Sequence, residues 1–269
     1  MKKILAIINE QIEHSHLIFQ LSKYHLRAEY ANHYLGVFWN ILQPAMQVLI
    51  YYVVFGLGLR GVRGDVGDLP FIMHLITGLF PWLFLSQGVL SASSAIQSKI
   101  GLVTKMKFPA STLLSISIVN GFVNLIFTTS IVVVLNLIFG YTSPLYTLGL
   151  IYFVVASYAF IFALGLIMSS LIILIRDAKN VLQNFIRMFF FMTPIFWSLN
   201  GANEILHVLT SLNPFGYLVM VYRNATVLGD EIIYGGMNDH LYFWLFTVLL
   251  MYVGAHVHYK FRGKLVDYL

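Results

Sequence analysis

Long apolar runs, broken by short polar segments, make up most of the chain. Residues 30–59, 69–98 and 108–175 contain no Asp, Glu, Lys or Arg. A helix that crosses a lipid bilayer needs about 20 mostly apolar residues. The first two runs are therefore long enough for one crossing each, and the third is long enough for two. Gly140 to Pro144 divides the third run with residues that are typical of a turn.

The pattern predicts an all-α integral membrane protein with six transmembrane helices per subunit. The ends of the helices are placed at flanking charges and turn residues. The expected spans are about residues 38–59, 69–91, 112–139, 146–175, 181–199 and 241–258.

The first thirty residues carry a different pattern. Apolar residues recur there at the three-to-four spacing of one helical face, namely Ile4, Leu5, Ile8, Ile12, Leu17, Leu21 and Tyr24. The apolar stretch is too short for a cleavable signal peptide. We expect residues 1–30 to form an amphipathic helix along the cytoplasmic surface of the membrane, with a loosely ordered tail as the alternative. Residues 31–269 would then form the transmembrane domain.

The segment of residues 200–240 is long for a connection between two spans. It contains two apolar runs, residues 205–212 and 217–228, on either side of Asn213-Pro214. Neither run is long enough to cross a bilayer. We expect two short re-entrant helices that enter the outer leaflet and turn at Pro214, because irregular backbone at that depth must be covered by protein.

Basic residues are distributed unevenly between the predicted loops. If the N-terminus lies inside, twelve of them fall on cytoplasmic segments and three on outer segments. The outer three are Arg60, Arg63 and Arg223. Such a bias predicts that both termini are cytoplasmic. It also explains most of the net charge of +5, so the charge does not indicate a nucleic-acid partner.

The composition and the missing residue types exclude several classes of protein. The chain is 59% hydrophobic and 10% charged, whereas about a quarter of a soluble domain is charged. No carboxylate occurs between Asp68 and Asp177, which disfavours transport driven by protons or cations. The chain has no Cys, no phosphate-binding loop motif, and nine scattered His. We therefore expect no catalytic, metal or cofactor site, and any nucleotide energy must come from a partner.

Two features of the predicted spans are candidates for a substrate path. Arg187 lies about seven residues into the fifth span, where it either contacts an anionic cargo or extends to the cytoplasmic interface. Aromatic residues make up 16% of the chain. Some belong to interfacial belts, and others are expected to present faces on which sugar rings stack. The candidate path consists of Tyr51, Tyr52, Phe55, Arg187, Phe190, Phe191, Phe196 and Trp197.

Two further patterns predict contacts, one between the helices of this chain and one with a partner protein. Small residues spaced four apart, such as Ser111 and Ser115 or Gly165 and Ser169, are expected to let helices approach closely. The loop of residues 99–109 is short and basic and ends at Pro109, which suits the start of the next helix. We expect this loop to dock a soluble partner. Its candidate contact residues are Lys99, Thr104, Lys105, Met106, Lys107 and Phe108.

Several motifs occur in an order that is known from one family. They are Lys23-Tyr-His-Leu-Arg27, Tyr34 to Pro44, Tyr51-Tyr-Val-Val-Phe55, Gly78-Leu-Phe-Pro-Trp82, Leu102 to Pro109, Met192-Thr-Pro-Ile-Phe-Trp197 and Leu212-Asn-Pro-Phe215 with Tyr222-Arg223. In this the chain resembles the type-2 ABC exporter permeases, the membrane subunits that move O-antigen, capsular polysaccharide and wall teichoic acid. The resemblance covers nearly the whole chain.

The resemblance implies a homodimer in the bacterial cytoplasmic membrane, with two copies of a separate ATPase that binds ATP and Mg²⁺. Each copy of this chain would dock on the ATPase through Ile4 to Tyr24 and through Lys99 to Phe108. The expected function is the export of a lipid-linked glycopolymer, without an enzymatic site in this chain. The alternatives are an exporter of a small drug or lipid, a transferase acting on polyprenyl-linked sugars, and a structural membrane scaffold.

Overall fold

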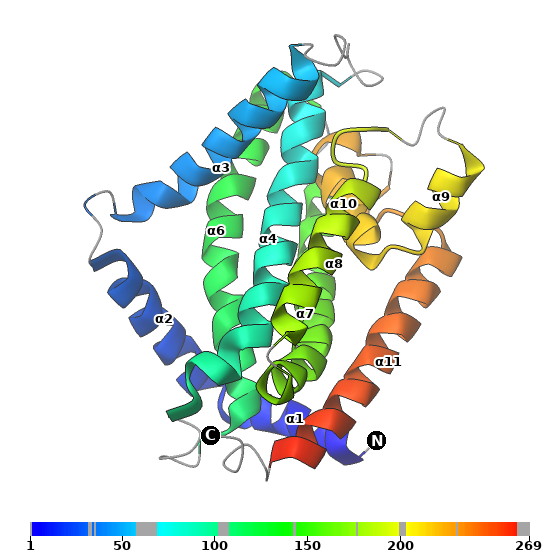
Figure 1. Cartoon of the computed structure of the whole chain (residues 1–269). Coiled ribbons are helices and arrows are strands. Elements are labelled where there is room, and N and C mark those ends of the chain that lie inside the picture. The colour runs from blue at the N-terminus through cyan, green and yellow to red at the C-terminus, as the bar shows by residue number, and fades with distance from the viewer. Residues whose placement is uncertain are drawn as a thin grey trace.

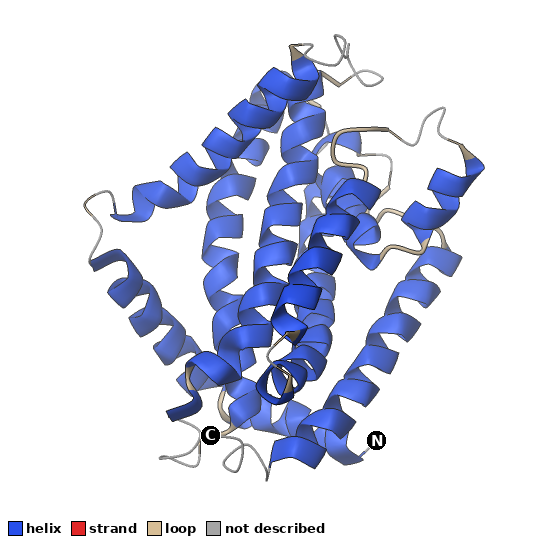
Figure 2. Ribbon diagram, viewed as in Figure 1, coloured by secondary structure: helices blue, strands red, loops and turns tan. Residues whose placement is uncertain are grey.

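The computed structural model describes most of the chain as a bundle of helices (Figure 1). The described residues are 2–31, 34, 36–57, 69–101, 108–141, 144–175, 177–198, 203–229 and 231–262. Within these ranges the elements of the fold are helices, as Figure 2 shows. The protein is thus all-helical, as predicted.

The helices follow one another with few long connections. The α-helices are α1 Lys2–Glu13, α2 Ser15–Ala31, α3 Trp39–Tyr51, α4 Phe71–Ser98, α6 Ala110–Phe139, α7 Gly149–Leu174, α8 Ala178–Met192, α9 Glu204–Ser211, α10 Pro214–Arg223 and α11 Met237–Arg262. Four short 3₁₀ or π segments adjoin α3, α7 and α10: η1 Gly36–Phe38, η2 Tyr52–Gly56, η3 Tyr146–Leu148 and η4 Asn224–Leu228.

Helix α4 forms the centre of the bundle and packs mainly on α6, α7 and α10. Its apolar residues are not confined to one face, as expected for a helix enclosed by other helices, and 72% of its most apolar 18-residue window is buried. Glycine allows α7 to approach it closely, because a Cβ at Gly165 would lie 3.0 Å from Cβ of Ala92. This contact confirms the predicted packing role of the small pair Gly165 and Ser169, both of which are buried.

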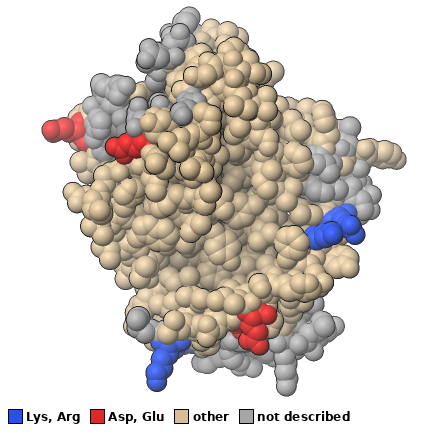
Figure 3. All heavy atoms as spheres, turned by 180° about the vertical axis from the view of Figure 1, so that it is seen from behind, with Lys and Arg blue, Asp and Glu red and all other residues tan. Residues whose placement is uncertain are grey.

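Among the described residues, four helical stretches are long and apolar enough to cross a membrane, namely residues 71–98, 110–139, 146–174 and 237–261. The chain is therefore a multi-pass membrane protein. Its surface agrees, since the middle of the face in Figure 3 shows no charged side chains.

The predicted first and fifth spans are shorter than expected. α3 has 13 residues and continues as a π segment to Gly56. α8 has 15 residues, which is about 22 Å at about 1.5 Å per residue. It ends at Met192 and not at residue 199, because Thr193 precedes Pro194 and adopts an extended conformation. Conversely, α4 runs seven residues beyond the predicted end of its span at residue 91.

The segment predicted to be re-entrant contains two short helices, α9 and α10, bent by 91° where the sequence places Asn213-Pro214. Asn213 caps α10, because its side-chain oxygen accepts a hydrogen bond of 3.0 Å from the backbone N–H of Phe215. Pro214 occupies the first turn, where a missing N–H costs nothing. Most of α10 is buried between α4 and α7.

The N-terminal residues form two helices in place of the single helix expected over residues 1–30. The first helix ends at Glu13 and the second begins at Ser15. α1 lies across the lower end of the bundle in Figure 1, and α2 turns upward against α6. Ile7 and Ile18 are buried against the bundle, whereas Leu5, Ile8 and Ile12 of the predicted apolar face are exposed.

Polar side chains attach α1 to α6. Gln11 Nε2 donates a hydrogen bond of 2.8 Å to Ser111 Oγ, which itself donates to the Glu10 carboxylate. Ser115 Oγ donates to Gln11 Oε1 over 2.6 Å, and it lies 2.8 Å from the Tyr158 hydroxyl on α7. The pair Ser111 and Ser115, expected to serve close helix packing, is therefore the polar attachment of α1. Their hydroxyls have partners that the local sequence does not reveal.

Candidate functional site

An aromatic cluster lies where α3 meets α8 and the segment after it. We define it as Tyr51, Phe55, Trp82, Phe190 and Phe196. The Tyr51 ring centroid is 5.7 Å from that of Phe190 and 5.0 Å from that of Phe196. The Phe55 and Phe196 rings stack at 4.7 Å, and the Trp82 and Phe190 rings are tilted at 5.4 Å. These separations are those of aromatic pairs in direct contact.

The local sequence explains how the cluster is assembled. Tyr51 and Phe55 are four residues apart and so lie on one face of α3 and its π extension. Because the helix stops before Pro194, the chain bends and brings Phe196 back beside Phe190, with ring centroids 5.1 Å apart. Four of the eight residues predicted for a substrate path thus meet in one cluster.

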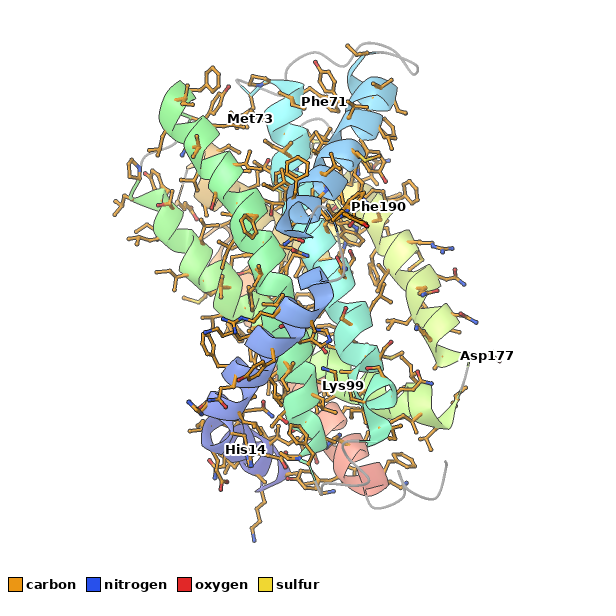
Figure 4. All side chains as sticks on the ribbon, turned by 90° about the vertical axis from the view of Figure 1, so that its left-hand side faces the viewer. His14, Phe71, Met73, Lys99, Asp177 and Phe190 are labelled. Atoms are coloured by element: carbon orange, nitrogen blue, oxygen red, sulfur yellow. The ribbon has the colours of Figure 1, made fainter. Side chains whose placement is uncertain are left out.

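A cavity of about 500 Å³ adjoins this cluster between α3, α4 and α8. We call it the α3–α8 groove. Its polar lining comes from Gln47, Ser86, Gln183 and Arg187, and its apolar lining includes the rings of Tyr51, Trp82 and Phe190. Figure 4 shows Phe190 on α8 close to α3, and the helix continuing down toward Asp177. The groove therefore combines aromatic faces with one cation.

Arg187 is exposed on α8 and makes no hydrogen bond or ion pair within the described part of the chain. Lys179, Gln183 and Arg187 follow one another at intervals of four residues, so they form one stripe along α8. Figure 4 shows side chains tipped with nitrogen along the outward side of this helix. The guanidinium donors of Arg187 are thus available to a ligand.

The other predicted path residues lie at the edge of the groove or outside it. Phe191 also lines the groove, and its ring is 69% exposed and 5.3 Å from that of Phe190. Tyr52 turns away and stacks on Phe71 at 6.3 Å. Trp197 is half-buried, and its backbone carbonyl accepts a hydrogen bond of 3.3 Å from His74 Nε2. The structure therefore does not place the side chains of Tyr52 and Trp197 in the groove.

Only the ends of the predicted docking loop belong to the described structure. Lys99 and Phe108 are both half-buried, and Phe108 packs against the core. Burial lowers the pKa of the Lys99 ammonium. Thr104, Lys105, Met106 and Lys107 lie outside the described residues. The docking role of this loop remains a prediction.

Sequence reasoning missed Arg223, which was expected on the outside. Its side chain is 2% exposed and lies between α10 and α4. Nη2 donates to the backbone oxygen of His74 over 3.1 Å, and Nε donates to Thr77 Oγ1 over 3.3 Å. Gly78 makes room for it, since a Cβ there would lie 2.5 Å from Nη2. The signal in the sequence was a lone charge in an otherwise apolar run, residues 217–228.

Among the described residues, no three His, Asp or Glu side chains lie together as a metal site would require. The groove therefore offers aromatic faces, amides, hydroxyls and one guanidinium. Such a site can bind a ligand that has apolar ring faces and negative charge, and its described lining contains no His, Asp, Glu or Lys.

Comparison with known proteins assigns the chain to a family. A family model described as "ABC-2 type transporter" matches residues 16–227. The chain is 26% identical over 222 residues to the O-antigen export system permease protein RfbA of Myxococcus xanthus, covering 82% of this chain and 84% of that protein. It is 23% identical over 256 residues to a protein of the same name from Klebsiella pneumoniae, covering 94% and 95%. The chain therefore belongs to the ABC-2 type transporter family.

Proposed function

We propose that this chain is the permease subunit of an ABC exporter that moves a lipid-linked glycopolymer across the bacterial cytoplasmic membrane. The α3–α8 groove is the observation that carries the proposal, because aromatic faces and an unpaired Arg187 meet there. The names of the relatives point to O-antigen as the cargo. Capsular polysaccharide and wall teichoic acid offer the same chemistry and are the next candidates.

The chemistry of the groove fits such a cargo in two ways. The apolar face of a sugar ring stacks on aromatic side chains without a fixed pattern of hydrogen bonds, so a moving polymer meets no single preferred register. The exposed Arg187 guanidinium presents several N–H donors, which suits the phosphate of a diphosphate-lipid linkage or of a teichoic acid backbone.

A second copy of the chain would complete the path. α8 exposes an apolar side, with Val181, Phe185 and Met188 at 50%, 52% and 46% exposure. One bundle encloses only the cavities between its own helices, whereas a two-fold pair places two grooves face to face. In this arrangement the short helices α3 and α8 are two of the six spans of each subunit, and they face the corresponding helices of the other copy. α9 and α10 form the re-entrant outer pair.

Energy would come from a separate ATPase that holds ATP and Mg²⁺. α1 and the loop of residues 99–109 are the proposed contacts, with both termini in the cytoplasm. Ser111 and Ser115 donate hydrogen bonds to Glu10 and Gln11, and Gln11 donates to Ser111, so α1 is attached to the transmembrane helix α6. A push on α1 would therefore be transmitted to α6 as a rigid-body movement. Removing the charges of Lys105 and Lys107 and replacing Met106 should weaken co-purification of the ATPase, and full docking would contradict the assignment.

The substrate assignment is tested by export in cells that carry single substitutions. Phe190→Ala and Arg187→Ala should each reduce the glycopolymer displayed at the cell surface and raise the lipid-linked pool inside. Phe139→Ala is the matched control, because its ring is 63% exposed and lies on α6, away from the groove. Normal surface glycan in a strain without the chain, together with drug sensitivity, would favour an exporter of a small drug or lipid instead.

A further inference from the structure

A second cavity lies on the other side of α3, between α3, α4 and α6. It has a volume of about 350 Å³, and we call it the amide cavity. Three helices supply polar side chains to it: α3 contributes Gln47, α4 contributes Ser86 and Gln87, and α6 contributes Asn124 and Thr128. Gln47 and Ser86 also line the α3–α8 groove. The two cavities therefore adjoin each other, and α3 and α4 contribute to the lining of both.

The amide cavity presents polar as well as apolar surface. Gln43 on α3 and Gln87 on α4 line it, and both side chains are exposed. Each amide has an oxygen that accepts and N–H groups that donate, so these side chains can exchange hydrogen bonds with a ligand. The volume also exceeds the need of a single water, which is about 10–15 Å³. The cavity thus has both the room and the chemistry for a ligand that carries several O–H donors.

The lining of the amide cavity contains no Lys, Arg, Asp, Glu or His. Its remaining surface includes the aromatic rings of Trp39, Phe80 and Phe84. A charged ligand would lose its hydration there without gaining an opposite charge. An uncharged ring with hydroxyl groups would instead gain amide acceptors at its edge and aromatic contacts at its faces. By contrast, the α3–α8 groove holds Arg187 and suits an anion.

We infer that the amide cavity binds an uncharged sugar ring of the glycopolymer, with its hydroxyl groups hydrogen-bonded to the exposed amides of Gln43 and Gln87. This inference rests on the proposed function. Different parts of the cargo then bind on the two sides of α3: Arg187 contacts its phosphate, and the amide cavity binds its sugars. Gln47 lines both cavities and so lies where the two parts of the cargo join.

The chain has no Cys, so an introduced thiol reports on one position. Asn124→Cys places a thiol in the amide cavity, and Arg187→Cys places one in the groove. Val132→Cys is the buried control on α6, at 0% exposure. Membranes containing the full transporter, with an ATPase that cannot hydrolyse ATP, are treated with a small water-soluble methanethiosulfonate. One set comes from cells that make the lipid-linked glycopolymer, and the other from cells without its first sugar transferase.

We expect Asn124→Cys and Arg187→Cys to react severalfold more slowly when the glycopolymer is present, and Val132→Cys to be unreactive in both sets. Protection at Arg187→Cys alone would overturn the amide cavity as a sugar site and leave the proposed function standing. Protection at neither position would count against both.

Ordinary lipids are present in both sets of membranes. An Asn124→Cys thiol that is unreactive in both sets would therefore show that lipid or protein fills the cavity, and the inference would fail. If Asn124→Cys does not accumulate in the membrane, Thr128→Cys replaces it, since Thr128 lines the same cavity one turn along α6.

Discussion

Arg223 and Arg187 occupy opposite environments, although each lies among apolar residues in the sequence. Arg223 is 2% exposed, and its guanidinium donates to His74 and Thr77 on α4. It also donates to Met220 Sδ over 3.4 Å. Arg187 is exposed beside the groove and has no partner in the described part of the chain.

The difference separates a structural arginine from one that is available to a ligand. The donors of Arg223 are already used to hold α10 against α4, so removing the side chain leaves a buried gap and unpaired acceptors. The donors of Arg187 have no partner in the described part of the chain, so its removal should destabilise the fold little. An anion bound in the groove would nevertheless lose its counter-charge. The following predictions test this contrast, from the largest expected effect on stability to the smallest.

Arg223→Leu should destabilise the protein most. It removes two hydrogen bonds to α4, and a hydrogen bond to a charged group is worth about 1.5–3 kcal/mol. We expect a loss of at least about 3 kcal/mol in the free energy of unfolding. Thermal unfolding of the purified protein in detergent measures it. Arg187→Leu is the matched control, and equal losses in the two variants would contradict the comparison.

Gly78→Ala tests the space that Arg223 occupies. The new Cβ would lie 2.5 Å from Arg223 Nη2 and 3.0 Å from the Ile195 Cα. Because the backbone of residue 195 cannot yield easily, we expect a loss of about 1–3 kcal/mol, as for an overpacked core. Gly121→Ala is the control, since its Cβ would meet the Phe84 ring at an ordinary 3.4 Å. A stable Gly78→Ala protein would show that the guanidinium is not held in place.

Ser115→Ala tests a second buried polar side chain that has partners, at the end of the bundle where α1 lies. It removes the hydrogen bonds to Gln11 and Tyr158, each worth about 0.5–1.5 kcal/mol. We expect faster amide hydrogen exchange in α1 and little change in the core of α7. Ser117→Ala should leave α1 unchanged, because Ser117 donates only to the backbone oxygen of Leu113 in its own helix.

Arg187→Ala should change stability least, within about 0.5 kcal/mol, as is usual for a substitution at an exposed site. Export should nevertheless fall, since the groove loses its cation. Arg187→Lys keeps the charge but not the planar donor arrangement, and it should restore part of the export. An Arg187→Ala protein with full export would remove the anion contact from the proposed mechanism.

The apolar pattern predicted much of the fold because helices that cross lipid satisfy their own backbone hydrogen bonds and need only length and hydrophobicity. The predicted third span, residues 112–139, lies within α6, and α7 ends one residue before its predicted end. α3 and α8 were harder to predict. Each lies in a segment predicted as a full span, yet α3 with its π extension ends at Gly56, and α8 ends at Met192, before Pro194.

The candidate site was predictable only as a set of residue types. Aromatic residues and Arg187 stood out in the sequence, but helix rotation decides which rings meet. Tyr51 and Tyr52 are neighbours in the chain, yet one joins Phe190 and the other stacks on Phe71. Successive residues on a helix point in different directions, by about 100°. Only the packed structure selects between them.

The sequence by itself determined that this chain is a helical membrane protein and a member of the ABC-2 type transporter family, because hydrophobic length and motif order are properties of the chain alone. The tertiary structure decided which polar groups are used up inside the protein. Ser111 holds α1, Arg223 holds α10, and the side-chain oxygens of Gln47 and Asn124 accept no hydrogen bond from a described residue. Hydrogen bonds between distant segments depend on where the helices pack, and no local pattern records their partners.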